Sequence, residues 1–156
     1  MLVNPQLKQT GKSHIEFNEI CDIVDIDNTS DLRYLSNCFN ESLRIETPVF
    51  YTTTMMFTED VDICGITLKK YDSFQIDNND LHNDPAQWQN PSRYIPERFD
   101  PTSPYFLTPS GKKRHPMSFV PFLGGKRICL GKTFAEVAAR LVGPGLFYQF
   151  DFEFVN

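Results

Sequence analysis

The stretch of this sequence best suited to chemistry is Phe122–Gly131, F-L-G-G-K-R-I-C-L-G, in which a cysteine follows a glycine-rich loop. The residues after Cys129 predict a helix, so we expect the sulfur at a helix N-terminus, where the helix dipole favours an anion. A cysteine thiolate is a nucleophile and a metal ligand, and coordination removes the thiol proton. Gly124 and Gly125 allow loop conformations that other residues avoid. The alternative interpretation is an inert, buried free cysteine beside a glycine-rich turn.

The same stretch matches the pattern F-x-x-G-x-R-x-C-x-G at every fixed position. That pattern is the haem-binding loop of the cytochrome P450 family, the haem-thiolate monooxygenases, and this chain resembles the C-terminal third of the family. The resemblance implies haem b (iron protoporphyrin IX) as cofactor and Cys129 as the axial iron ligand, a thiolate that favours O–O cleavage. It also implies roles for the other fixed residues: Phe122 excludes water, Gly125 shapes the loop, Arg127 contacts a haem propionate and Gly131 lets the helix approach the porphyrin.

Two more motifs resemble the family. Glu41 and Arg44 form an E-x-x-R motif at the end of a predicted helix, where residues three apart share a face. Pro96–Phe99, P-E-R-F, matches the family's meander motif. The resemblance implies a structural triad of Glu41, Arg44 and Arg98, because guanidinium–carboxylate bonds can fasten a loop to a helix. Three unrelated surface charges are the alternative.

Two family features have no counterpart here. The acid–threonine signature of the oxygen-activating helix is absent, because Asp27-Asn28-Thr29 has no glycine before it and lies in a predicted loop. We therefore expect the chain to begin after that helix. Met55 stands where many family members have an arginine that contacts a haem propionate.

By descent, the resemblance implies an enzyme that inserts one oxygen atom of O2 into a small organic substrate, with electrons from NADPH through a partner reductase. No catalytic residue beyond the haem ligand is expected in this chain. The alternative is a non-catalytic fragment or an incomplete gene model that lacks the oxygen-activating helix. The substrate cannot be inferred, because most substrate contacts of the family belong to its N-terminal two-thirds.

Positive charge concentrates between Gly111 and Lys132, a stretch without Asp or Glu, although the whole chain has a formal charge of −5. In the family this side of the haem docks the electron donor, and such a field would steer an acidic partner. A solvated basic loop is the alternative. With Arg127 assigned to the haem, the candidates for docking a reductase are Lys112, Lys113, Arg114, Lys126 and Lys132.

Composition predicts one globular domain over residues 1–156, since 40% of the residues are hydrophobic and 22% are charged, and the resemblance implies that this domain is a partial one. No run approaches the ~20 apolar residues of a membrane span, and no signal peptide begins the chain. The resemblance suggests the endoplasmic reticulum membrane or the cytoplasm for a full-length parent, and no nucleic-acid partner. Three cysteines are interpreted as small core residues in a reducing compartment: Cys21, Cys38 and Cys64. Among the histidines, His82 is interpreted as a structural hydrogen-bonding residue, and His14 and His115 as surface residues.

The predicted fold class is α+β, mainly helical, the C-terminal part of the cytochrome P450 fold. Hydrophobic periodicity, capping residues and turn signals predict the elements in this order: a helix over 4–20, a helix over 31–44, a small sheet over 49–76, loops over 78–121, the haem-binding loop 122–131, a helix over 129–149 and a strand over 150–154. A tight hairpin is expected at Gly65. Because Gly143-Pro144-Gly145 falls inside the last helix, we expect a kink or a break there.

Overall fold

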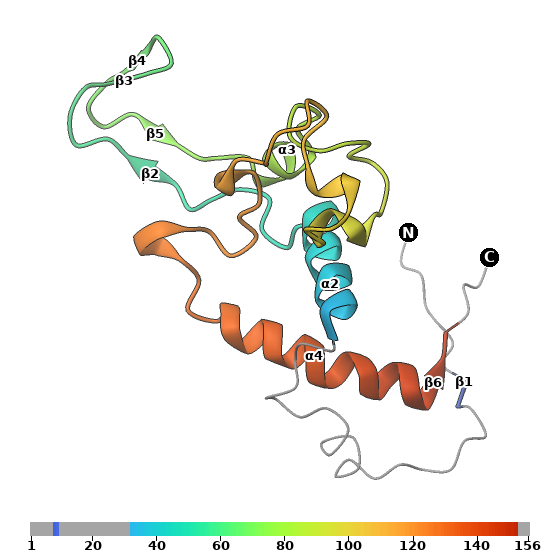
Figure 1. Cartoon of the computed structure of the whole chain (residues 1–156). Coiled ribbons are helices and arrows are strands. Elements are labelled where there is room, and N and C mark those ends of the chain that lie inside the picture. Colours follow the sequence, from blue (N-terminus) through green and yellow to red (C-terminus); the bar gives the residue numbers. More distant parts are fainter. Residues whose placement is uncertain (1–7, 10–31, 153–156) are drawn as a thin grey trace. The chain divides into compact units, whose positions relative to one another are not determined.

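The computed structural model describes residues 8–9 and 32–152 (Figure 1). The chain divides into two compact units, one formed by residues 40–129 and one that contains residues 1–39 and 130–156. Its described elements are helices, short 3-10 helices and short antiparallel strands, which confirms the predicted α+β class. Within the described residues, no helix is both long enough and apolar enough to cross a membrane.

Helix α2 spans Arg33–Ile45, and its C-terminal part, from residue 40 on, belongs to the unit formed by residues 40–129. The buried residues of α2 are Glu41, Leu43 and Arg44, so its interior face carries two charges beside one apolar side chain. Such a face cannot be stabilised by apolar burial alone, and it requires polar partners from elsewhere in the unit.

Four short strands follow α2 and form the extended arm visible in Figure 1. Strand β2 (Met55–Met56) pairs with β5 (Ser73–Phe74), and β3 (Val61–Ile63) pairs with β4 (Ile66–Leu68), all antiparallel. Cys64 and Gly65 have φ angles of 53° and 81°, as a two-residue hairpin turn requires. Cys64 is exposed there, so the prediction that it is a core residue is wrong.

The segment after the arm consists mostly of loops with short helices. Helix α3 (Asn78–Asn83) begins after Asp77, whose side chain accepts a hydrogen bond from the Asp80 amide. Proline occupies the first position of three of the 3-10 helices, where its missing N–H costs nothing. The 3-10 helices are η2 (Pro96–Phe99), η3 (Pro104–Phe106), η4 (Pro116–Ser118) and η5 (Gly125–Arg127).

The interior of the unit formed by residues 40–129 is small and unusually polar. Trp88 is its largest buried side chain, and its ring lies 6.0 Å from that of Phe99 and 6.2 Å from that of Phe119. The other fully buried large side chains of the described residues are all polar or charged: Arg44, Arg98, His82, Glu41 and Asn78. Hydrogen bonds must therefore specify much of this core.

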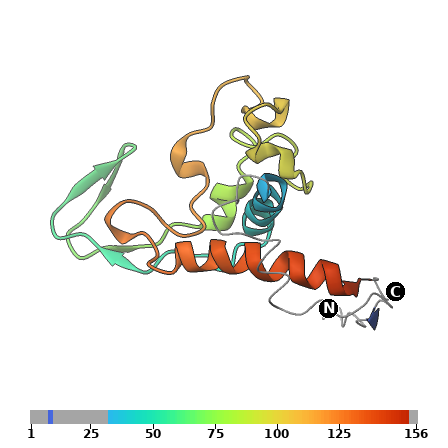
Figure 2. The same ribbon diagram turned by 60° about the horizontal axis from the view of Figure 1, so that its bottom comes forward.

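Helix α4 (Lys132–Gln149) dominates the described part of the other unit and leads into strand β6 (Phe150–Asp151). It contacts the start of α2, because Arg140 Nε donates to Ser36 Oγ at 3.2 Å. Of the kink or break expected at Pro144, the break is wrong, because α4 runs through this residue as one helix, as Figure 2 shows; the kink stays a prediction. The glycines on both sides of Pro144 carry no side chains, so the backbone can adjust around the ring.

Strand β6 pairs antiparallel with β1 (Lys8–Gln9). The helix predicted over 4–20 is therefore wrong at these two residues, where strand pairing with a distant segment overrides local helix propensity. The rest of the helix predicted over 4–20 lies outside the described residues. So do His14, Cys21 and the end of the predicted strand beyond residue 152.

Candidate haem-thiolate site

The loop that carries Cys129 is closed by backbone hydrogen bonds. The Leu123 amide donates to the Val120 carbonyl at 2.9 Å, and the Cys129 amide donates to the Phe122 carbonyl at 2.8 Å. Leu123 and Gly125 both have a φ angle of 59°, in the left-handed region that costs a residue with a Cβ more than glycine. These turns fold the loop back so that Cys129 returns to the backbone of Phe122.

Cys129 is a free and exposed cysteine. The alternative of a buried free cysteine is therefore wrong. Ile128 beside it is 51% exposed, and Arg127 is exposed and makes no side-chain hydrogen bond or ion pair within the described residues. The loop thus presents a thiol, an apolar side chain and an uncommitted guanidinium to whatever binds there.

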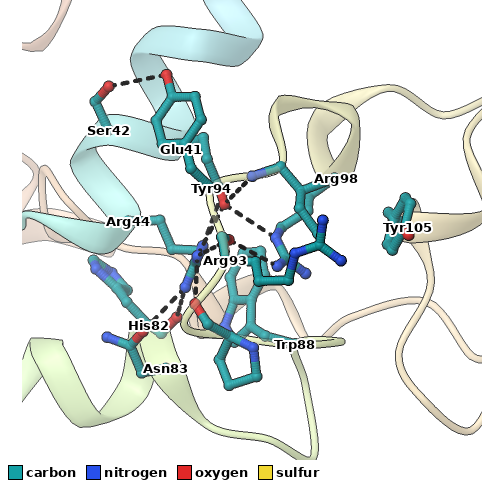
Figure 3. A network of polar contacts seen from close by, with 12 residues as sticks. Glu41, Ser42, Arg44, His82, Asn83, Trp88, Arg93, Tyr94, Arg98 and Tyr105 are labelled. Carbon is teal, nitrogen blue, oxygen red and sulfur yellow. Dashed lines mark hydrogen bonds and ion pairs between the residues drawn. The ribbon is translucent and has the colours of Figure 1, made fainter.

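Glu41 joins two arginines in the polar interior of the same unit. Its carboxylate accepts from Arg44 Nε at 2.8 Å and from Arg44 Nη2 at 2.9 Å, a bidentate pair, and from Arg98 Nε at 3.1 Å. The Ile95 amide adds a fourth bond at 2.9 Å. All three charged side chains are fully buried, so Glu41, Arg44 and Arg98 lie together and are not unrelated surface charges. Figure 3 shows this network.

The two guanidinium groups also bind a backbone carbonyl in the last turn of α3 and several in the loop that precedes η2. Arg44 donates to the carbonyls of His82 at 3.0 Å and Pro91 at 2.7 Å. Arg98 donates to the carbonyls of Gln89 and, at 2.7 Å, Asn90. The network therefore fastens an irregular segment to the last turn of α2, and it does so at carbonyls that no helix or sheet satisfies.

A third arginine belongs to this interior, and sequence reasoning placed it elsewhere. Arg114 lies 4.4 Å from the centre of the Trp88 ring and 5.5 Å from that of Phe106, and it donates to the carbonyls of Tyr105 and Arg98. Burial, together with the charge of Arg98, lowers the pKa of Arg114 to about 10. Arg114 is half-buried and its guanidinium is engaged with these rings and carbonyls, so it is a weaker docking candidate than its exposed neighbours, and its docking role stays a prediction. No signal in the sequence distinguished it from its basic neighbours Lys112 and Lys113.

His82 connects this interior to the segment that leads into the cysteine loop. Its side chain is fully buried, and Nε2 accepts a hydrogen bond from the Val120 amide at 3.0 Å. Burial, and then the charge of Arg44, lower the pKa of His82 to about 4. The neutral imidazole therefore carries its proton on Nδ1, which has no hydrogen-bond partner within the described residues.

Comparisons with known proteins decide the family. The family model for Cytochrome P450 matches residues 6–156. The chain belongs to the cytochrome P450 family. It is 36% identical over 137 residues to cytochrome P450 4A12 of Rattus norvegicus and 34% identical over 112 residues to cytochrome P450 4F6 of the same organism. These matches cover 86% and 72% of this chain, but only 25% and 20% of those relatives.

A solved structure agrees with the sequence comparisons. A cyanobacterial cytochrome P450, CYP120A1, determined with bound retinoic acid, superposes with a TM-score of 0.71 at 28% identity. The superposition covers 86% of this chain and 30% of that protein. The described architecture is therefore part of the cytochrome P450 fold, and the family is one of haem-thiolate monooxygenases, oxidoreductases that bind haem iron.

The residues present fit the prosthetic group of the family. Haem iron needs one axial ligand from the protein, and Cys129 offers an accessible thiol that is in no disulfide. A porphyrin needs apolar surface and a cation for its propionates, and the loop offers Ile128 and Arg127. Within the described part of the chain no cluster of three or more metal-binding side chains competes as a metal site.

Other residues predicted for the site take less distinctive places. Phe122 is partly buried, and Gly131 is the N-cap residue of α4. Met55 pairs with Phe74 in the β2–β5 ladder, so the arginine that many family members have would project from this strand. Of the predicted docking residues, Lys112, Lys113 and Lys126 are exposed. Lys132 Nζ lies 3.9 Å from Glu136 Oε1.

Proposed function

We propose that Cys129 is the axial thiolate ligand of haem b and that the protein acts as a monooxygenase through that haem. The observation that supports this most directly is an exposed free thiol in a loop closed by the bond from the Cys129 amide to the Phe122 carbonyl. A backbone closed in this way holds the sulfur in one place before the metal arrives. A preorganised ligand loses less conformational freedom on binding.

The other loop residues would support the bound haem. Arg127 would pair with a propionate, since its guanidinium is exposed and has no side-chain partner in the described part of the chain. Phe122 would help to keep water from the sulfur, while Gly125 and Gly131 would allow close approach of the loop and of the following helix. When bound, the haem supplies dioxygen reduction: one oxygen atom enters an organic substrate and the other leaves as water, using two electrons and two protons.

We further propose that these electrons come from NADPH through a reductase that docks on basic side chains near the cysteine loop. Lys112, Lys113 and Lys126 are exposed and could attract an acidic partner. Lys132 remains a weaker candidate because of its neighbour Glu136. Mutating rim charges of this kind mainly changes the association rate and its dependence on salt.

For the 156 residues by themselves, the alternative of a non-catalytic piece predicts haem binding without turnover. The sequence contains no acid–threonine signature to deliver protons to bound oxygen, and Met55 replaces one haem-contacting arginine. A longer reading frame upstream that encodes this signature would favour the monooxygenase for the whole protein. Substrate hydroxylation by the 156-residue chain with a reductase, above a haem-only control, would contradict the non-catalytic alternative.

The ligand assignment is tested by adding haem to the chain and recording the ferrous carbonyl spectrum. We expect a thiolate-type Soret band with the native sequence and its loss in Cys129→Ser. Cys64→Ser is the matched control, because Cys64 is also a free, exposed cysteine but lies in the β3–β4 turn. Persistence of the thiolate-type band in Cys129→Ser, or its loss in Cys64→Ser, would show that the assignment is wrong.

A further inference from the structure

The buried side chain of His82 makes a long-range bond that its helix does not need. Helix α3 ends at Asn83, and the imidazole Nε2 accepts from the Val120 amide 38 positions further along the chain. The ring also packs against Phe119, with 5.3 Å between ring centres. His82 thus contacts two consecutive residues of the segment that leads into the cysteine loop.

Val120 is the residue whose carbonyl accepts the first hydrogen bond of that loop. Its carbonyl accepts from the Leu123 amide at 2.9 Å, and the next closure joins the Cys129 amide to the Phe122 carbonyl at 2.8 Å. On the other side, the His82 carbonyl accepts from Arg44 Nη1 at 3.0 Å, as Figure 3 shows. A continuous set of contacts therefore runs from Glu41 through Arg44 and His82 to the cysteine loop.

Packing alone does not explain a histidine at this position. A phenylalanine ring would fill the same space against Phe119 without leaving the buried Nδ1 unpartnered among the described residues. The imidazole differs from that ring by offering an acceptor nitrogen to the Val120 amide. Val120 is half-buried while His82 is fully buried, so this bond ties the Val120 backbone to a fixed point of the interior.

We propose that His82 is a positioning residue: its neutral imidazole anchors Val120 and thereby holds the cysteine loop to the Glu41–Arg44 pair. The anchoring concerns the protein alone. Only its consequence, that the thiol of Cys129 is held where haem iron can be bound, rests on the proposed function.

Amide hydrogen exchange of the 156-residue chain tests the anchor without any haem. Glutamine carries its amide oxygen about as far from the backbone as Nε2, so His82→Gln keeps an acceptor, whereas His82→Phe keeps the ring but has none. We expect the Val120 amide to exchange about tenfold faster in His82→Phe and to recover most of its protection in His82→Gln. The Ser118 amide, which donates to the His115 carbonyl at 2.9 Å, serves as the internal reference and should not change.

Two outcomes of this experiment would overturn the proposal. One is equal Val120 exchange in the native chain and His82→Phe. The other is equally fast exchange in His82→Phe and His82→Gln, because the histidine would then act by packing and not as an acceptor. His115→Phe is the matched control, since His115 is exposed and its Nδ1 accepts a hydrogen bond from the local Met117 amide at 3.1 Å.

A second measurement follows the consequence for the thiol. With haem added, we expect the thiolate-type fraction of the ferrous carbonyl spectrum to fall in His82→Phe and to be rescued in His82→Gln. If the native chain shows no thiolate-type band, the proposed function fails for this chain, while the exchange data still decide whether His82 anchors Val120. A normal thiolate-type fraction in His82→Phe, with faster Val120 exchange, would refute the link between the anchor and the thiol.

Discussion

Replacing Glu41 with alanine removes the carboxylate that holds two buried arginines. Four hydrogen bonds of 2.8–3.1 Å disappear, three from guanidinium groups and one from the Ile95 amide. Arg44 and Arg98 are left fully buried without a counter-ion. Arg114 is near them: burial first, and then the charge of Arg98, lower the pKa of Arg114. The variant therefore leaves two fully buried positive charges beside a third, half-buried one, with no carboxylate between them.

The size of the effect follows from this burial. Removing one partner of a buried ion pair typically costs about 3–5 kcal/mol, because the remaining charge is uncompensated. For a chain of this size such a loss lowers the midpoint of thermal unfolding by about 6–20 °C. We expect haem retention to fall as well. Without Glu41 the two arginines are no longer held in place, so they bind the carbonyls of the loop over 89–93 less well.

Urea unfolding at low temperature, followed by circular dichroism, measures this loss, and haem content after gel filtration measures retention. Glu46→Ala is the matched control, since Glu46 lies just beyond the end of α2 and is exposed. Glu41→Gln should fall between the two variants, because its amide keeps one acceptor oxygen but no charge. Equal unfolding free energies and equal haem contents in Glu41→Ala and Glu46→Ala would refute the reasoning.

Two further predictions follow from the same interior. The folded-state pKa of His82, about 4, lies below its ordinary value of 6.5, so the unfolded chain binds more protons between these pH values. Stability should therefore fall as pH decreases from about 6.5 to 4, by up to about 3 kcal/mol, and urea titrations at each pH should show this component missing in His82→Gln. Arg114→Lys should lower the unfolding free energy by about 1–2 kcal/mol, because lysine lacks the planar group that stacks on Trp88 and Phe106. Urea titrations measure this loss. Lys112→Ala is the control and should show no change, because the Lys112 side chain is exposed.

The sequence was most informative where function requires fixed spacing. The cysteine loop and the E-x-x-R motif are short, so their residues are neighbours in any fold that contains them, and their family resemblance could be read directly. The hairpin at Gly65 was also predictable, because two adjacent residues with positive φ need little beyond local turn chemistry.

The remaining features depend on contacts between distant segments, which a single sequence does not encode in its periodicity. Lys8 and Gln9 pair with residues more than 140 positions away, and the helix predicted there gave way to that pairing. In the sequence Arg114 does not differ from its basic neighbours; its contact with the Trp88 ring, made across the fold, is what distinguishes it. His82 was expected to form a structural hydrogen bond, but the identity of its partner, Val120, could come only from the fold.

The ionic character of this core has a reason that differs from net stability. Buried ion pairs often contribute little compared with apolar side chains of the same size, because removing charges from water is costly. Here, however, the loop over 89–93 is irregular and brings four carbonyls into contact with the interior, where they need donors: those of Gln89, Asn90, Pro91 and Arg93. An apolar side chain offers none, whereas each guanidinium offers five N–H groups in a rigid plane. Arg44 and Arg98 supply these donors, and Glu41 offsets part of their charge, so the network is best understood as the means by which an irregular loop is held in one conformation beside the segment that carries the cysteine.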